Sequence, residues 1–106
     1  MVLVSVTFPT MSEARRFSKK LVRQRLAACV NIHPIESIYW WKGKLVHTQE
    51  AIAEAKTVNG KVSAIKRFVQ KNHSDQIPAV IVTSVRDTLS SYRKWVAIET
   101  HKHARS

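Results

Sequence analysis

The sequence predicts an α+β fold in which two helices cover one face of an antiparallel sheet and a third helix follows. Three observations support this. Apolar residues recur at helical spacing in two segments, valine-rich segments lie between and around them, and a long hairpin is centred on one of only two glycines. A length of 106 residues favours a single domain over residues 1–106.

The chain starts with a valine-rich segment, residues 2–8, that we expect to form a mostly buried strand ended by Pro9. An amphipathic helix over about residues 12–25 is predicted next, with Ser12 as its candidate N-cap. Its apolar residues recur at helical spacing, and most of its basic residues fall on other faces. The apolar positions are Ala14, Phe17, Leu21 and Val22.

A long hairpin follows the first helix. Its first strand starts near Ala27 and contains Pro34, which cannot donate a ladder hydrogen bond, so the strand must bend, bulge or lie at an edge there. The strand resumes over residues 38–41. Gly43 lies where a tight turn requires a positive φ, and the return strand covers residues 45–57.

The remaining chain predicts a turn, a helix, a strand and a final helix. Asn59-Gly60 marks the turn, residues 72–76 form a polar loop, and residues 79–85 form a buried strand. The helix between them has the apolar positions Val62, Ile65, Phe68 and Val69. The final helix, capped near Thr88 or Ser90 and followed by a frayed end at residues 101–106, has Leu89, Tyr92, Trp95, Val96 and Glu99 on its pattern.

The resulting order is β-α-β-β-α-β-α, which is the ferredoxin-like βαββαβ sandwich with a C-terminal helix. The hairpin is too long for this sheet, because its strands extend about 30 Å or more at roughly 3.3 Å per residue. The overhang exposes unpaired backbone, with Trp40 on one face and Tyr39 and Trp41 on the other. Such edges and aromatic patches indicate an interface, so we predict a closed homo-oligomer.

Charge is the unusual bulk property of this chain. Eighteen Lys and Arg against seven Asp and Glu give a net charge of +11, which attracts polyanions at low salt. Six of the basic residues lie between Arg15 and Arg25. A solvated helix face accounts for them most simply, and a surface that contacts nucleic-acid phosphates is the alternative.

Catalytic motifs are not found in the sequence. Two glycines, Gly43 and Gly60, do not allow a phosphate-binding loop, and no serine has the context of a nucleophile elbow. The single cysteine, Cys29, excludes an intramolecular disulfide and is best explained as a buried structural thiol. We therefore expect no enzyme. We also expect no secretion signal or membrane span, and a reducing, cytoplasmic location.

Histidines are the candidate metal ligands. His73 is the first candidate because it ends the second helix and precedes a loop packed near the sheet; an exposed histidine favoured by the helix dipole is the alternative. His101 and His103, close together in the C-terminal end, suggest only adventitious metal capture. The other two are His33 and His47.

Two adjoining stretches resemble the CutA divalent-cation-tolerance family. They read Arg25-Leu-Ala-Ala-Cys-Val-Asn-Ile32 and Ser37-Ile-Tyr-Trp-Trp-Lys-Gly-Lys44, and the resemblance extends from Val2 to Trp95. It implies ferredoxin-like subunits similar to the PII signalling proteins, which assemble as compact trimers through strand pairing between subunits. It also implies a non-catalytic protein linked to divalent metal ions, with copper or another divalent cation as the ligand.

The sequence departs from the family pattern around its candidate metal site. The usual His-Pro-Tyr-Glu-x-Pro-Glu motif appears as His73-Ser-Asp-Gln-Ile-Pro78-Ala79. The positions of the copper ligands credited to some members read Val6 and Asn72-His73, so His73 alone carries over. The acidic run after the hairpin turn is reduced to a single acid, Glu50.

Three functional hypotheses follow from the residues and the resemblance together. The first is a trimeric, non-catalytic CutA-like protein of metal-ion homeostasis or signalling. The second is a basic module that contacts RNA or DNA phosphates through the helix that carries Arg15 to Arg25. The third is a purely structural assembly module.

Overall fold

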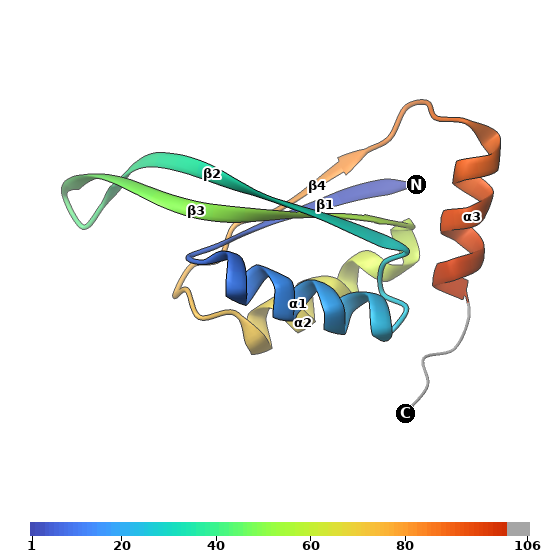
Figure 1. Ribbon diagram of the computed structural model, residues 1–106, viewed down its shortest axis with the longest axis horizontal. Helices are drawn as coiled ribbons and strands as arrows, with labels where there is room; N and C mark the ends of the chain where they lie inside the picture. Colours follow the sequence, from blue (N-terminus) through green and yellow to red (C-terminus); the bar gives the residue numbers. More distant parts are fainter. Residues whose placement is uncertain (102–106) are drawn as a thin grey trace.

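The computed structural model describes residues 1–101 and confirms the predicted order of elements (Figure 1). The strands and helices are β1 (Val2–Phe8), α1 (Met11–Arg23), β2 (Cys29–Trp41), β3 (Lys44–Thr57), α2 (Val62–Asn72), β4 (Val80–Ser84) and α3 (Ser90–His101). A short 3₁₀ helix, Asn59–Lys61, stands where the turn was predicted. The predicted frayed end lies outside the described residues, except for His101, which is the last residue of α3.

The four strands form one antiparallel sheet in the order β2-β3-β1-β4. Both α1 and α2 cover the same face of this sheet, and α3 lies at its end (Figure 1). Alternation along β1 and β3 builds the core under the two helices. The buried strand residues on that face are Val2, Val4, Val6, Phe8, Ala51, Ala53 and Ala55, and they share one cluster with Phe17, Leu21, Ile65 and Val69 from the helices.

The start of α1 differs from the prediction. Thr10, not Ser12, is the N-cap, and its Oγ1 accepts a 3.1 Å hydrogen bond from the backbone N–H of Glu13. Thr10 has the extended backbone that a cap requires, with φ −139° and ψ 155°. Ser12 lies inside the first turn, where its hydroxyl accepts a bond from Arg16.

The end of α1 also differs, because the helix stops at Arg23 and not at Arg25. Arg25 adopts φ +62° and bonds its N–H to the carbonyl of Val22, while Leu26 bonds to the carbonyl of Leu21. These two bonds form a Schellman motif, in which the left-handed position is usually glycine. An arginine thus occupies the position that ends the helix.

The hairpin turn has the predicted geometry. Lys42 and Gly43 both have positive φ, 49° and 78°, as a two-residue type I′ turn requires. Pro34 pairs in regular register with Ala51, and β2 is an edge strand, so of the three predicted alternatives the structure shows the edge position.

The fourth strand was predicted to be buried over residues 79–85, and that prediction is wrong. The strand is Val80–Ser84 and forms the other edge of the sheet, and its one partner within the described part of the chain is β1. Ile81 is 62% exposed and Val82 is 41% exposed. An apolar run alone does not distinguish a central strand from an edge strand whose outer side is uncovered in one subunit.

Candidate functional site

His73, the predicted metal ligand, is the C-cap residue of α2 and its side chain is fully buried. The imidazole stacks on the ring of Phe8 with a centroid distance of 4.6 Å and an interplanar angle of 14°. Phe8 itself belongs to the core. The alternative of an exposed helix-end histidine is therefore wrong, because the ring packs under the loop that leads to β4.

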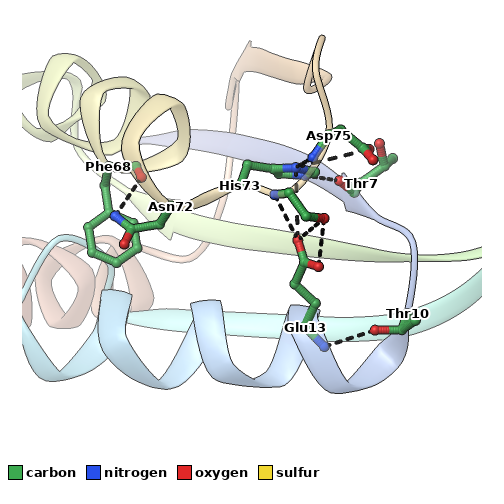
Figure 2. A network of polar contacts seen from close by, with 8 residues as sticks. Thr7, Thr10, Glu13, Phe68, Asn72, His73 and Asp75 are labelled. Carbon is green, nitrogen blue, oxygen red and sulfur yellow. Dashed lines mark hydrogen bonds and ion pairs between the residues drawn. The ribbon is translucent and has the colours of Figure 1, made fainter.

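Both nitrogens of the His73 ring are hydrogen-bonded (Figure 2). Nε2 lies 2.6 Å from the carbonyl oxygen of Thr7 at the end of β1, and Nδ1 lies 2.9 Å from the backbone nitrogen of Asp75. A carbonyl accepts and a backbone N–H donates, so Nε2 carries the proton and Nδ1 accepts. This pattern defines one neutral tautomer of the imidazole.

Two carboxylates flank this histidine. Glu13 Oε2 lies 3.9 Å from Nδ1, and Asp75 Oδ2 lies 4.0 Å from it. Glu13 is held by Ser74, whose hydroxyl donates to both carboxylate oxygens at 2.7 and 2.9 Å and whose N–H donates at 3.3 Å. Figure 2 shows this network joining the start of α1, the end of β1 and the loop after α2.

The donor set around His73 does not fit a metal ion as it stands. A ligand bond through either nitrogen would have to displace a hydrogen bond to Thr7 or Asp75. Over residues 1–101, no cluster of three or more His, Cys, Asp or Glu side chains is close enough to hold a metal. The network instead ties three elements together around a buried ring.

The other histidines are distributed over the molecule. His47 Nε2 lies 3.1 Å from Glu36 Oε1 across the hairpin, and His33 Nδ1 lies 3.9 Å from Glu54 Oε1. Both pairs are exposed. His101 ends α3, and His103 lies outside the described residues.

A second candidate site is the overhanging part of the hairpin, which we call the ribbon and define as residues 36–49. Among the strands of residues 1–101, only β2 and β3 pair there, because β1 pairs with β3 from Ala51 onward. Ile38, Trp40 and Leu45 are 66%, 72% and 63% exposed. Thr48 Oγ1 is buried without a hydrogen-bond partner among the described residues. The ribbon thus presents apolar surface and one unsatisfied polar atom.

The single cysteine lies beside α3. Cys29 is a free, half-buried thiol, and it neighbours the phenol of Tyr92. Burial raises the pKa of Tyr92 above 10.0, and the thiol of Cys29 raises it further through its charge interaction and hydrogen bond. Cys29, at the start of β2, thus neighbours α3 and is half-buried, whereas a buried thiol was predicted.

Several interactions of this region were not predicted from sequence. They are the Glu13–Ser74 bonds and the ion pair between Arg25 and Glu99, each of which joins residues more than 60 positions apart. The only local signal was the acid at the third position of α1, which suits the helix dipole and does not reveal its partner.

Membrane-spanning helices are not found: within residues 1–101, none has the length and apolar character to cross a bilayer. The fold and its extended ribbon define a ferredoxin-like domain of the PII-like class, since the PII-like protein CutA from Nostoc superimposes with a TM-score of 0.89. That structure shares 28% identity, over 95% of this chain and 98% of its own.

Comparison with protein families gives a narrower assignment. The model of the CutA1 divalent ion tolerance protein family matches residues 2–99. The divalent-cation tolerance protein CutA of Pyrococcus horikoshii is 34% identical over 102 residues, which is 96% of this chain and 100% of the relative. A crystal structure of CutA1 from that organism gives a TM-score of 0.92 at 33% identity and the same coverage. The chain belongs to the CutA family.

Proposed function

We propose that this protein is a non-catalytic, homotrimeric CutA protein that takes part in the tolerance of divalent cations. The observation that carries the proposal is the family match over residues 2–99 together with a ribbon that has no partner strand beyond the hairpin itself. The predicted overhang gives the physical reason for assembly. Three-fold symmetry is taken from the family resemblance.

The ribbon supports assembly by its edges and by its side chains. In one subunit, the outer sides of β2 and β4 are both unpaired, since these strands are the two edges of the sheet. Pairing β2 of one subunit with an edge of the next would satisfy both sets of backbone groups. It would also cover Trp40 and Leu45 and bring a partner within reach of Thr48.

The cation enters this proposal because the relatives are named divalent-cation tolerance proteins. Copper or another divalent cation is the proposed ligand, and His73 stays a prediction as its ligand residue. The hydrogen bonds of His73 do not favour that role. A cleft between adjoining subunits is the alternative place for the cation.

Two further parts of the proposal concern the lack of enzymatic activity and the location in the cell. A non-enzymatic role is supported by the family name and by the lack of a nucleophile or acid–base motif in the sequence. A cytoplasmic location is supported by a single free thiol, Cys29. Fractionation of cells that produce the protein tests the location directly.

Light scattering coupled to size-exclusion chromatography tests the assembly. We expect a mass of three subunits at micromolar concentration, and we expect Trp40→Glu to shift it toward smaller species because a charge would have to be buried. Lys66→Glu, an exposed change on α2, is the matched control. A monomeric wild-type protein at that concentration would refute the proposal.

Isothermal titration with copper and zinc tests the cation. The wild-type protein and His73→Ala are compared without tags, with His47→Ala as the control for an exposed histidine. Loss of binding only in His73→Ala would establish His73 as a ligand, provided that the variant still assembles. Equal binding by all three proteins removes His73, and no binding by the wild type removes the cation from the proposal.

A further inference from the structure

The outer surface of the two-helix layer is strongly basic. Along α1 and α2 there is a single acid, Glu13, and its carboxylate is bonded to Ser74. Eight basic residues accompany it, and none of them forms an ion pair with a carboxylate among residues 1–101. These are Arg15, Arg16, Lys19, Lys20, Arg23, Lys66, Arg67 and Lys71, all exposed. Their charge is therefore available to a partner.

Helix α1 stands between two grooves that are both lined by basic residues. The groove toward β2 has a volume of about 500 Å³, and Arg15, Lys19 and Arg23 line it together with the apolar side chains of Val22, Val30 and Ile32. The groove toward α2 has a volume of about 490 Å³ and is lined by Lys20, Arg23 and Lys71. Positions four apart on a helix are about 6 Å apart along its axis, so Arg15, Lys19 and Arg23 are evenly spaced along the flank toward β2, while the other groove is bordered by cations from both helices.

The chemistry of this surface disfavours two other anionic partners. The apolar residues of α1 point into the core, and only Val22 among them is exposed, at 37%, so the helix has no apolar face to insert into a membrane. The two helices offer one partly exposed aromatic ring, Phe68, which lines the groove toward α2, whereas Phe17 is buried. Single-stranded nucleic acid, which relies on base stacking, therefore fits poorly.

We propose that α1, with the cations of its two grooves, binds the phosphate backbone of duplex DNA without sequence preference. A helix about 10–12 Å across matches the major groove of B-form DNA, about 12 Å wide, and its two basic flanks then face the phosphates of both strands. The major groove of duplex RNA is too narrow to admit it. This activity is additional to the proposed function and uses the helix layer, leaving the ribbon free.

Fluorescence anisotropy with a mixed-sequence DNA duplex of about 20 base pairs tests the proposal over 50–200 mM salt. The logarithm of the binding constant should fall linearly with the logarithm of salt. Lys19→Glu with Lys20→Glu removes one cation from each groove. We expect it to weaken binding at least about tenfold and to reduce the salt slope by about 2.

The control is Arg86→Glu with Lys94→Glu, which makes the same charge change at exposed positions outside the two-helix layer. It should keep the affinity within about threefold, because the contacts are local. A loss as large as that of the α1 variant would show that net charge alone attracts DNA and would overturn the site. Circular dichroism and light scattering verify that each variant folds and assembles. If the glutamate variant of α1 does not fold and assemble, Lys19→Gln with Lys20→Gln replaces it.

The choice of partner has its own tests. A duplex RNA of the same length should bind more weakly, and equal affinity would overturn the assignment to DNA. Vesicles of phosphatidylserine and phosphatidylcholine should not compete with DNA at equal phosphate concentration, and effective competition would overturn it in favour of a lipid surface. A salt-independent affinity would overturn the phosphate contacts themselves.

Discussion

Arg25 and Glu99 lie 74 residues apart, and the guanidinium Nη1 of the first is 2.6 Å from the carboxylate Oε2 of the second. The same Nη1 lies 3.5 Å from the backbone carbonyl of Glu99. Arg25 is also the residue with φ +62° that ends α1. A backbone conformation that favours glycine is thus combined with a side chain that ties α3 to the end of α1.

This combination predicts a double-mutant cycle in which the size of one change depends on the other. Arg25→Gly removes about 1 kcal/mol of left-handed strain and loses an ion pair of similar strength, so its net effect on unfolding should be near zero. With Glu99→Gln already present, the ion pair is gone, and Arg25→Gly should stabilise by about 1 kcal/mol. Urea unfolding at one protein concentration measures both values. Equal stabilisation in the two backgrounds would show that the ion pair contributes nothing.

The His73 ring predicts a large loss of stability when it is truncated. His73→Ala removes the stacking on Phe8 and leaves the Thr7 carbonyl and the Asp75 N–H without their partner. We expect a loss of about 2–4 kcal/mol in the free energy of unfolding. His73→Phe keeps the ring and loses only the polar contacts, so it should cost less than His73→Ala. Guanidinium unfolding at fixed concentration compares them.

His33→Ala is the matched control for that change, because the His33 side chain is 52% exposed. It should change the free energy of unfolding by less than about 0.5 kcal/mol. A His73→Ala protein as stable as His33→Ala would contradict the structural role of the buried ring.

The two glycines predict opposite results for the same substitution. Gly43 has φ +78°, while Gly60 does not have a left-handed φ, and an added Cβ meets nothing within 4 Å at either position. Gly43→Ala should therefore destabilise by about 1 kcal/mol through backbone strain alone. Gly60→Ala should be neutral or stabilise by up to about 1 kcal/mol by restricting the unfolded chain. Thermal unfolding of both variants measures these changes in stability. Destabilisation by Gly60→Ala would contradict the prediction.

Much of the fold could be predicted because its signals are local. The valines of β1, the apolar spacing of α1 and α2, and Gly43 in the hairpin turn each report a short-range preference that the structure keeps. The length of the hairpin against a seven-residue β1 also predicted the overhang.

The features that sequence reasoning missed depend on contacts between distant segments. Glycine usually occupies the left-handed position of a Schellman motif, so propensity does not predict Arg25 there. Glu99, which forms the ion pair with Arg25, lies in another helix. The burial of His73 requires β1, α1 and the loop after α2 to meet around one ring. The edge position of β4 follows from topology, not from its apolar run.

The phenol of Tyr92 predicts how stability changes at high pH. Its pKa is raised above 10.0 by burial first and by Cys29 second. Between the unfolded and the folded pKa, the folded protein binds more protons than the unfolded chain, so stability falls as pH rises above about 10 and through the folded pKa. Tyr92→Phe should show a shallower fall of stability over that range.

Cys29→Ala should bring the pKa of Tyr92 nearer to 10.0 without restoring it, because burial, the larger cause, stays. Tyrosinate absorbance, taken as the difference between each protein and its Tyr92→Phe counterpart, measures this pKa; an unchanged value in Cys29→Ala would remove the thiol as a cause.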